Sequence, residues 1–358
     1  MKILVSLISG QTMPNYFGIK YYEPDKCIFL FTEESTQQME WLKKAVGLPK
    51  ETIKIDSYNY ENIQEKCQKI IKDYGEEELI LNYTCGTKIM SIASFEIFML
   101  HRKKTFYVDS ENQKILEQES GKNKTIDFNL NISIEEYLSV YGQEIKTSTE
   151  LKKEYHDAAL YIGSNYYRIS DQLLYIAKHK SEILKNRKFL KKNISLSSQG
   201  QNTQIQIMDK QFMLKDNFEN AIKFLTGGWL EYQVYDILKN ENIFDDIKLN
   251  LQIDWKNKQA RDKEKFKNEI DVFCTMNGTA YIFECKSGDI TQDTIYKFKA
   301  LKEFVAGRYA KVLIVTYYKL SPEQVEKIKD FYFTNLELQK LSRFLKELKQ
   351  NIKKNPNL

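Results

Sequence analysis

The residue types best suited to chemistry gather in one segment of the second half of the chain, residues 268–288, which reads NEIDVFCTMNGTAYIFECKSG. Its Asn277-Gly278 pair lies between two runs rich in β-branched and aromatic residues, a combination that predicts a hairpin with a two-residue turn. With that turn, Met276 faces Thr279, and the register of the whole hairpin follows. The charged residues of the segment can therefore be placed relative to one another.

This register puts Asp271 opposite Glu284 and Glu269 opposite Lys286, on one face of the hairpin because strand side chains alternate between faces. Facing Cβ atoms lie about 4.5 to 5.5 Å apart, so the two carboxylates repel each other unless a cation lies between them. A divalent cation with oxygen ligands suits that position. A solvated hairpin with Glu–Lys pairs across its strands is the alternative. The run from Ala280 carries charge only at the end of an apolar stretch, which favours a functional cluster.

The elements that must position this cluster are expected on both sides of it. A helix is predicted from Gly228 to Lys239 by its apolar spacing. A basic stretch, Lys256 to Lys267, could follow a phosphate backbone near the cluster, although charge runs are usually solvated loops. The expected strands lie near 249–255, 269–275, 280–286 and 311–317, with a helix near 294–304 and a packing helix within 323–354.

The first half alternates short apolar runs with longer amphipathic ones. Ile63, Cys67 and Ile70 have the spacing of one helix face and predict a helical connection between two strands. Such alternation is typical of a parallel, doubly wound, Rossmann-like sheet. The expected strands are Ile3 to Ile8, Ile28 to Phe31, Thr52 to Ile55, Leu79 to Tyr83 and Thr105 to Val108.

In doubly wound sheets, ligands bind beyond the carboxyl ends of the strands, so the loops after the first and fourth strands are candidate sites. Small polar residues fill both, with a lysine ending the second: SGQTMPN (9–15) and NYTCGTK (82–88). Hydroxyls, a lysine and the free N–H groups of a helix start suit a phosphate. Neither GxGxxG nor GxxxxGK[ST] occurs, so neither a standard dinucleotide site nor a P-loop is expected. Each loop taken alone could also be an ordinary helix start.

Composition narrows the class of protein. The 358 residues suggest two domains. The net charge of +5 permits nucleic-acid binding without requiring it. The five scattered cysteines form no CxxC pair, which argues against a disulfide framework or a zinc site and favours a reducing, cytoplasmic location. The first residues resemble a buried strand rather than a signal peptide, and the apolar stretch Ile89 to Leu100 is too short to span a membrane.

The predicted division of the chain has three parts. Residues 1–146 form the doubly wound domain, 147–202 a helical linker or the start of the second domain, and 203–358 the domain with the carboxylate cluster. The polar segment 193–202, NISLSSQGQN, is expected to be a loop.

Asp271 and the triplet Glu284-Cys285-Lys286 resemble the core motif of the PD-(D/E)xK nucleases, whose restriction-endonuclease-like α/β fold the resemblance implies for the second domain. It also implies that Asp271 and Glu284 hold Mg²⁺ or Mn²⁺, that the Cys285 carbonyl adds a ligand, and that Lys286 orients or helps deprotonate the attacking water. Glu231 corresponds to the acidic residue that such nucleases often carry on a preceding helix. Its alternative is an ordinary surface glutamate.

Nearly the whole chain resembles the CARF nucleases of type III CRISPR systems, the CRISPR ancillary nucleases. The resemblance is carried by LISGQTMPN, NYTCGTKIMSIASFEIF, TGGWLEYQVYDIL, NEIDVF and IFECKSG. Family members commonly have a second glycine where this chain has Cys85. The resemblance implies that a cyclic oligoadenylate, expected to be cyclic tetra-adenylate, activates cleavage of single-stranded DNA, RNA or nicked duplex. It implies a homodimer that shares the activator, with these activator-binding residues: Ser9, Gln11, Thr12, Thr84, Gly86, Thr87 and Lys88.

Two other functions compete with this hypothesis. A nucleotide-responsive transcription regulator could carry the same sensor, but it has no use for the cluster of Asp271, Glu284 and Lys286. A DNA-repair or restriction nuclease could carry the cluster without any small-molecule switch.

Overall fold

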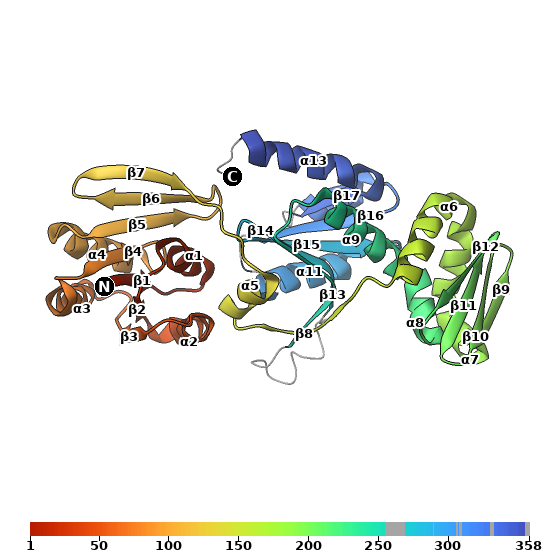
Figure 1. Ribbon diagram of the computed structural model, residues 1–358, viewed down its shortest axis with the longest axis horizontal. Coiled ribbons are helices and arrows are strands. Elements are labelled where there is room, and N and C mark those ends of the chain that lie inside the picture. The colour runs from red at the N-terminus through yellow and green to blue at the C-terminus, as the bar shows by residue number, and fades with distance from the viewer. Residues whose placement is uncertain (255–268, 289, 306, 308–309, 330–332, 355–358) are drawn as a thin grey trace.

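The structure is a computed structural model that describes residues 1–254, 269–288, 290–305, 307, 310–329 and 333–354. Three units follow one another across the molecule, with a seven-stranded sheet at one end, a six-stranded sheet in the centre and a four-stranded sheet at the other end (Figure 1). No helix among the described residues is both long and apolar enough to cross a membrane.

The first unit is a doubly wound sheet with the strand order β3-β2-β1-β4-β5-β6-β7. The first five strands in this order are parallel, as predicted, whereas β6 and β7 extend the sheet as an antiparallel hairpin that was not predicted. The strands are β1 (Lys2–Leu7), β2 (Lys26–Phe31), β3 (Lys50–Lys54), β4 (Glu78–Asn82), β5 (Lys104–Asp109), β6 (Lys114–Glu119) and β7 (Lys122–Asp127). The helical segments are α1 (Met13–Tyr22), η1 (Glu33–Ser35), α2 (Thr36–Ala45), α3 (Tyr60–Tyr74), α4 (Lys88–Leu100) and α5 (Ile134–Val140).

Both faces of this sheet are buried, which explains why its central strands read as continuous apolar runs. Ile3 and Val5 face one core together with α3 and α4, whereas Leu4 faces a second core together with α1 and α2. The direction of winding reverses between β1 and β4, so the loops that follow these two strands meet at the topological switch point.

The central sheet has the order β17-β16-β15-β14-β13-β8 and contains the predicted hairpin as β14 and β15. Its outermost strand, β8 (Glu144–Thr149), pairs with β13. The expected domain boundary after residue 146 is therefore wrong, because it cuts through a strand of the second sheet. The strands are β13 (Asp246–Asp254), β14 (Glu269–Met276), β15 (Thr279–Lys286), β16 (Lys311–Thr316) and β17 (Thr334–Glu337), and the helical segments are η2 (Phe224–Gly228), α9 (Trp229–Glu241), α11 (Gln292–Val305), α12 (Pro322–Lys329) and α13 (Leu338–Lys354).

The third unit lies between β8 and α9 in the sequence and forms an antiparallel sheet of order β12-β11-β10-β9 with helices on one face. The helical stretch was predicted, but the expected loop at 193–202 is wrong, because these residues form most of β10, a turn at Gly200, and the start of β11. The elements are α6 (Lys153–Lys178), α7 (Lys180–Asn186), β9 (Lys188–Lys191), β10 (Ile194–Gln199), β11 (Asn202–Ile207), β12 (Lys210–Leu214) and α8 (Phe218–Lys223).

One apolar core is continuous between the first unit and the central sheet. Phe17 of α1 and Ile132 belong to the same cluster as Ile270 and Phe273 of β14. Polar contacts reinforce this junction, since Gln113 Nε2 donates to the Asn277 carbonyl at 3.0 Å and the Ile134 amide donates to Asp246 at 3.0 Å. The hairpin turn is thus fixed against the first unit.

Candidate active site

The β14–β15 hairpin has the predicted turn and register. Asn277 and Gly278 both adopt positive φ angles, 50° and 72°, as the two central residues of a type I′ turn must. Met276 pairs with Thr279, and the same register continues to Val272 and Phe283. One further step along the strands brings Asp271 and Glu284 together.

Asp271 and Glu284 are both buried, with 2% and 3% of their surface exposed. Asp271 Oδ2 accepts a hydrogen bond from the Cys285 amide at 2.7 Å, which fixes this carboxylate against the end of β15. The Lys286 Nζ atom lies 3.8 Å from Asp271 Oδ2 and 3.9 Å from Glu284 Oε2, and 5.2 Å from the centre of the Phe298 ring of α11. The structure therefore brings two carboxylates and one ammonium together at one end of the hairpin.

Lys286 stays protonated in this environment. Burial lowers its pKa, but the negative charges of Asp271 and Glu284, with a smaller contribution from Glu231, outweigh burial and raise the pKa above its ordinary value. A protonated lysine can donate hydrogen bonds to a water molecule or a phosphate oxygen. It cannot accept a proton, so this arrangement favours orientation over deprotonation of a nucleophile.

Glu231 approaches the cluster from α9. It is half-buried, and its negative charge raises the pKa of the Cys285 thiol as well as that of Lys286. The π-helical segment η2 precedes α9, and Ser287 Oγ donates to the Thr226 carbonyl at 3.2 Å, which ties the end of β15 to this segment. Local π-helical turns often occur at functional sites.

The oxygen donors at this site fit a divalent cation of the Mg²⁺ or Mn²⁺ type. Two buried carboxylates face the same ammonium, so a position of strong negative potential exists between them. The Cys285 side chain belongs to the apolar core, and burial raises its thiol pKa, so only its main-chain carbonyl is a suitable ligand. Within the described residues no group of three or more His, Cys, Asp or Glu side chains is arranged to hold a metal, which leaves further coordination positions for water or substrate.

Two expectations about the surroundings of the cluster have other outcomes. Glu269 lies opposite Gln252 of β13, and the ion pairs that Lys286 forms with described residues are those to Asp271 and Glu284, so the expected pairing of Glu269 with Lys286 is not seen. The basic stretch Lys256 to Lys267 lies outside the described residues.

The loops after β1 and β4 lie next to each other, held by a residue that sequence analysis missed. Asn82, fully buried at the end of β4, donates to the Pro14 carbonyl at 3.2 Å and accepts from the Thr84 amide at 3.1 Å. Cys85 Sγ donates to the Gln11 carbonyl at 3.3 Å, so this side chain lies beneath the loops. A polar residue at the end of an otherwise apolar strand was the signal that could have identified Asn82.

Two of the predicted activator-binding hydroxyls are already engaged within the protein. Thr12 is fully buried, and its hydroxyl donates to the Val140 carbonyl at 2.7 Å, so the expectation that it faces a ligand does not hold in this conformation. The Thr84 hydroxyl donates to Asn82 and accepts from the Val108 amide at 2.8 Å. Both residues therefore shape the loops from within.

The remaining predicted residues present groups at the surface of the switch point. Gly86 has a φ of 90°, and Thr87 caps α4 by accepting from the Met90 amide at 3.2 Å. Lys88, the first residue of α4, is exposed and forms no ion pair with any described residue. Ser9 and Gln11 are half-exposed in the facing loop. A helix start, a lysine and two facing polar side chains thus share one edge of the sheet.

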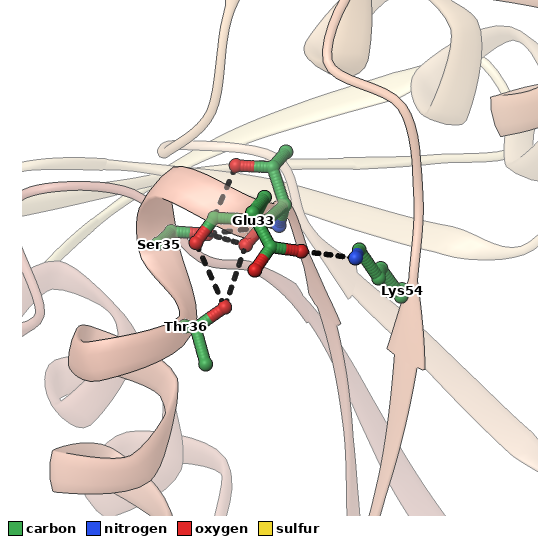
Figure 2. Close-up of polar contacts among 5 residues, drawn as sticks. Glu33, Ser35, Thr36 and Lys54 are labelled. Atoms are coloured by element: carbon green, nitrogen blue, oxygen red, sulfur yellow. Dashed lines mark hydrogen bonds and ion pairs between the residues drawn. The ribbon is translucent and has the colours of Figure 1, made fainter.

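The neighbouring loop after β2 differs, because its polar groups bond to one another. The Thr32 amide donates to Ser35 Oγ at 2.9 Å, and Thr36 Oγ1 donates to the Glu33 carbonyl at 2.8 Å. Figure 2 shows these contacts together with the ion pair between Glu33 and Lys54 at the end of β3. This loop fixes the start of α2 and leaves the switch point as the better candidate for a ligand.

Comparison with known proteins gives both halves a family. Residues 3–137 match the family model of the Card1 CARF domain, and residues 218–353 match that of the Card1-like endonuclease domain. No curated protein matches the sequence significantly.

Two solved structures share the fold over almost their whole length. Can2 from Sulfobacillus thermosulfidooxidans, in complex with cyclic tetra-adenylate, is 21% identical with a TM-score of 0.77, covering 97% of this chain and 99% of its own. Protein VC1899 from Vibrio cholerae is 18% identical with a TM-score of 0.78, covering 98% of both chains.

Proposed function

Because this chain is a CARF nuclease effector, formed by a Card1 CARF domain and a Card1-like endonuclease domain, we propose that cyclic tetra-adenylate activates its metal-dependent cleavage of nucleic acid. Such effectors act in the antiviral defence of type III CRISPR systems. The endonuclease domain argues against a transcription regulator, and the CARF domain argues against a nuclease without a switch.

The observation that carries the catalytic proposal is the meeting of two buried carboxylates and a protonated lysine at one end of the hairpin. Asp271, Glu284 and the Cys285 carbonyl would hold Mg²⁺ or Mn²⁺, which when bound stabilises negative charge on the phosphate. Lys286 donates to the attacking water or to a phosphate oxygen and so orients it. Glu231 adds negative charge near Lys286 and keeps it protonated.

The sensor proposal rests on the loops at the switch point. The Can2 structure contains cyclic tetra-adenylate, and this chain has the same fold. Lys88 and the amino-terminal end of α4 would bind activator phosphate, with Gly86 allowing close approach and Ser9 and Gln11 contacting the ligand from the opposite loop. Thr12, Thr84 and Thr87 hold the loops in shape. Two copies of the chain would share one cyclic ligand as a homodimer.

We assign residues 1–140 to the sensor and β8 together with residues 218–354 to the nuclease. The support for this division is that β8 pairs with β13 while α5 ends at Val140. The unit from α6 to β12 then stands as an insertion between the two conserved domains.

A cleavage assay tests the proposed function. Single-stranded DNA, RNA and nicked duplex are incubated with the protein and Mg²⁺ or Mn²⁺, with and without cyclic tetra-adenylate. We expect cleavage of at least one substrate only when both activator and metal are present, and EDTA should stop it. Asp271→Asn and Glu284→Gln should each reduce the rate at least about a hundredfold, because each removes a metal-binding charge.

Thermal denaturation and activator titration serve as controls, since both variants must fold and bind activator for the result to count. A folded Asp271→Asn protein that cleaves at the parent rate would refute the catalytic assignment. Equal cleavage with and without activator would refute the switch.

A further inference from the structure

The positive charge of the chain is concentrated in one short segment of the inserted unit. Residues 178–192 contain seven Lys or Arg residues and one acidic residue, so this segment alone exceeds the net charge of +5 of the whole chain. It comprises α7, β9 and the turns beside them, and neither domain family match includes it. The basic residues are Lys178, Lys180, Lys185, Arg187, Lys188, Lys191 and Lys192.

These side chains are available to an external anion. All seven except the half-buried Lys180 are exposed, and none forms an ion pair with a residue that the structure describes. Lysines on the edge strand β9 could simply prevent pairing with another sheet. That explanation covers Lys188 and Lys191 but leaves the basic residues of α7 and of both flanking turns without a role.

Contacts within the unit connect this basic segment to the middle of α6. The Lys191 ammonium lies 3.2 Å from the centre of the Tyr175 ring, and Asn193 Nδ2 donates to the Arg168 carbonyl at 3.2 Å. Lys192 therefore lies near the exposed Arg168 of α6. The positive surface continues from β9 onto this helix.

The next residue along α6 leads to the active site. Tyr167 is 77% exposed, and its ring centre lies 6.0 Å from that of Tyr317. Tyr317 directly follows Thr316, the residue of β16 that pairs with Lys286. Tyr317 Oη also donates to the Gly163 carbonyl at 2.6 Å, which fixes α6 against this strand end.

The outer face of the four-stranded sheet borders the basic segment and carries neutral hydrogen-bonding groups. Ser195 pairs with Gln206, and Ser197 pairs with both Gln204 and Lys188, with these side chains pointing away from the covered face. No carboxylate occurs at these paired positions. The segment therefore borders a surface without opposing charge.

We infer that Tyr167, Arg168 and the basic residues 178–192 form a track that binds the single strand the nuclease cleaves and leads it to Lys286. The inference rests on the proposed function and adds a binding surface that the two conserved domains do not contain. Lysines neutralise the phosphates of the strand, and the exposed Tyr167 ring stacks on one base. A stacked base requires an unpaired strand, which is why the occupant is single-stranded.

Charge reversal tests the phosphate contacts. Binding of a labelled mixed-sequence strand of about 30 nucleotides, as DNA and as RNA, is measured by anisotropy with catalytically inactive Asp271→Asn protein, with and without activator. Adding Lys188→Glu and Lys192→Glu should weaken binding at least about fivefold at low salt and reduce the salt dependence by roughly 1.4, about 0.7 per contact. The matched control, Lys69→Glu with Lys72→Glu on α3, makes the same charge change and should bind like the parent.

Substitution of Tyr167 tests the stacking contact. Tyr167→Ala should weaken binding about fivefold or more, whereas Tyr167→Phe, which keeps the ring, should bind like the parent. In otherwise active protein, both the charge-reversal pair and Tyr167→Ala should raise KM with little change in kcat. Thermal denaturation confirms that these exposed substitutions leave the fold intact.

Each other outcome overturns the inference. It fails if the charge-reversal pair binds the strand like the α3 control, or if Tyr167→Phe loses as much affinity as Tyr167→Ala. It also fails if the parent binds vesicles of anionic phosphatidylglycerol but not the strand. Failure of the proposed function is distinct, because it is seen as absent cleavage by the parent and does not affect the binding measurements.

Discussion

Two lysines in this chain have opposite surroundings and, we propose, separate tasks. Lys286 lies among the negative charges of Asp271 and Glu284, which hold its proton. Lys88 is exposed at the first turn of α4, where the helix dipole already favours an anion. A negatively charged ligand at α4 is therefore attracted both by the helix and by the side chain.

Substitution of each lysine should separate sensing from cleavage. Lys88→Ala should weaken binding of cyclic tetra-adenylate about tenfold, because it removes a charge-assisted hydrogen bond to phosphate. Its cleavage should fall at limiting activator and partly recover at high concentration. Lys286→Ala should bind activator like the parent and lose cleavage at every concentration. Calorimetric titration beside a cleavage assay measures both effects.

The two results are independent of each other. Parent-like binding and activation of Lys88→Ala would show that the activator loop is assigned wrongly. Normal cutting by Lys286→Ala would show the same for the catalytic cluster.

Individual side chains were predictable from the sequence where local rules act and unpredictable where distant partners decide. The Asn277-Gly278 turn fixed the register of Asp271 and Glu284 because only a few residues tolerate two positive φ angles in succession. Thr12 looked like a ligand-binding hydroxyl, but its partner is the Val140 carbonyl, which is 128 positions away. No pattern in the sequence shows such a contact.

At the scale of elements, the β14–β15 hairpin joins the two candidate sites. Its turn packs on Phe17 of α1, the helix that directly follows the loop of Ser9 and Thr12. Its other end carries Asp271 and Lys286. A shift of α1 on activator binding would thus reach the hairpin through direct packing, and the hairpin is the element best placed to couple the sites.

A methyl group at the turn should weaken that coupling. In Gly278→Ala the new Cβ would overlap the Phe17 ring at a φ of 72°, so the free energy of unfolding should fall by about 1–2 kcal/mol from backbone strain, and further from the overlap. Gly121→Ala is the matched control, because its φ is 79° and no atom lies within 4 Å of its new Cβ. Denaturant unfolding and activator-dependent cleavage compare the two.

We expect Gly278→Ala to be the less stable variant and to show less cleavage at saturating activator. If the two alanine variants are equally stable and equally activated, the hairpin turn does not couple the sites.

The elements themselves were predictable where burial on both faces leaves an apolar run. β1 and β15 were found for this reason, whereas β8, EIKTST, and β10, ISLSSQ, are largely polar and were missed. β10 buries only one face and presents serine on the other, so its polar residues resembled a loop. Leu336 was expected on the last helix but lies in β17, because pairing with β16 overrides its local preference.

At the scale of the whole molecule, the shared core between the sensor and the central sheet limits independent motion of the two domains. Phe17 and Phe273 belong to one apolar cluster, and Lys248 forms an ion pair with Glu135 at 3.1 Å across the junction. Relative domain motion is the usual expectation where an interface is small and polar. Here the apolar contact favours a transmitted shift over free rotation.

The outer face of α4 is apolar and has no partner among the described residues of the chain. Ile92 is 56% exposed, and Phe95 and Met99 continue the same stripe as half-buried residues, at helical spacing. This helix starts at Lys88, so a second copy packed on the stripe would bring the two activator loops together. A two-fold axis there matches the symmetry of a cyclic tetranucleotide.

Substitution at the centre of this stripe should therefore separate the subunits. We expect the parent to scatter light as a particle of twice the 42.4 kDa chain mass at micromolar concentration, because two exposed apolar stripes gain free energy when they bury each other. Ile92→Glu places a charge in that contact and should give monomers with weaker activator binding. Leu174→Glu, on the exposed face of α6, makes the same kind of change outside the sensor and should stay dimeric. A parent that remains monomeric with saturating cyclic tetra-adenylate would refute the shared pocket, and a dimeric Ile92→Glu protein would move the interface away from α4.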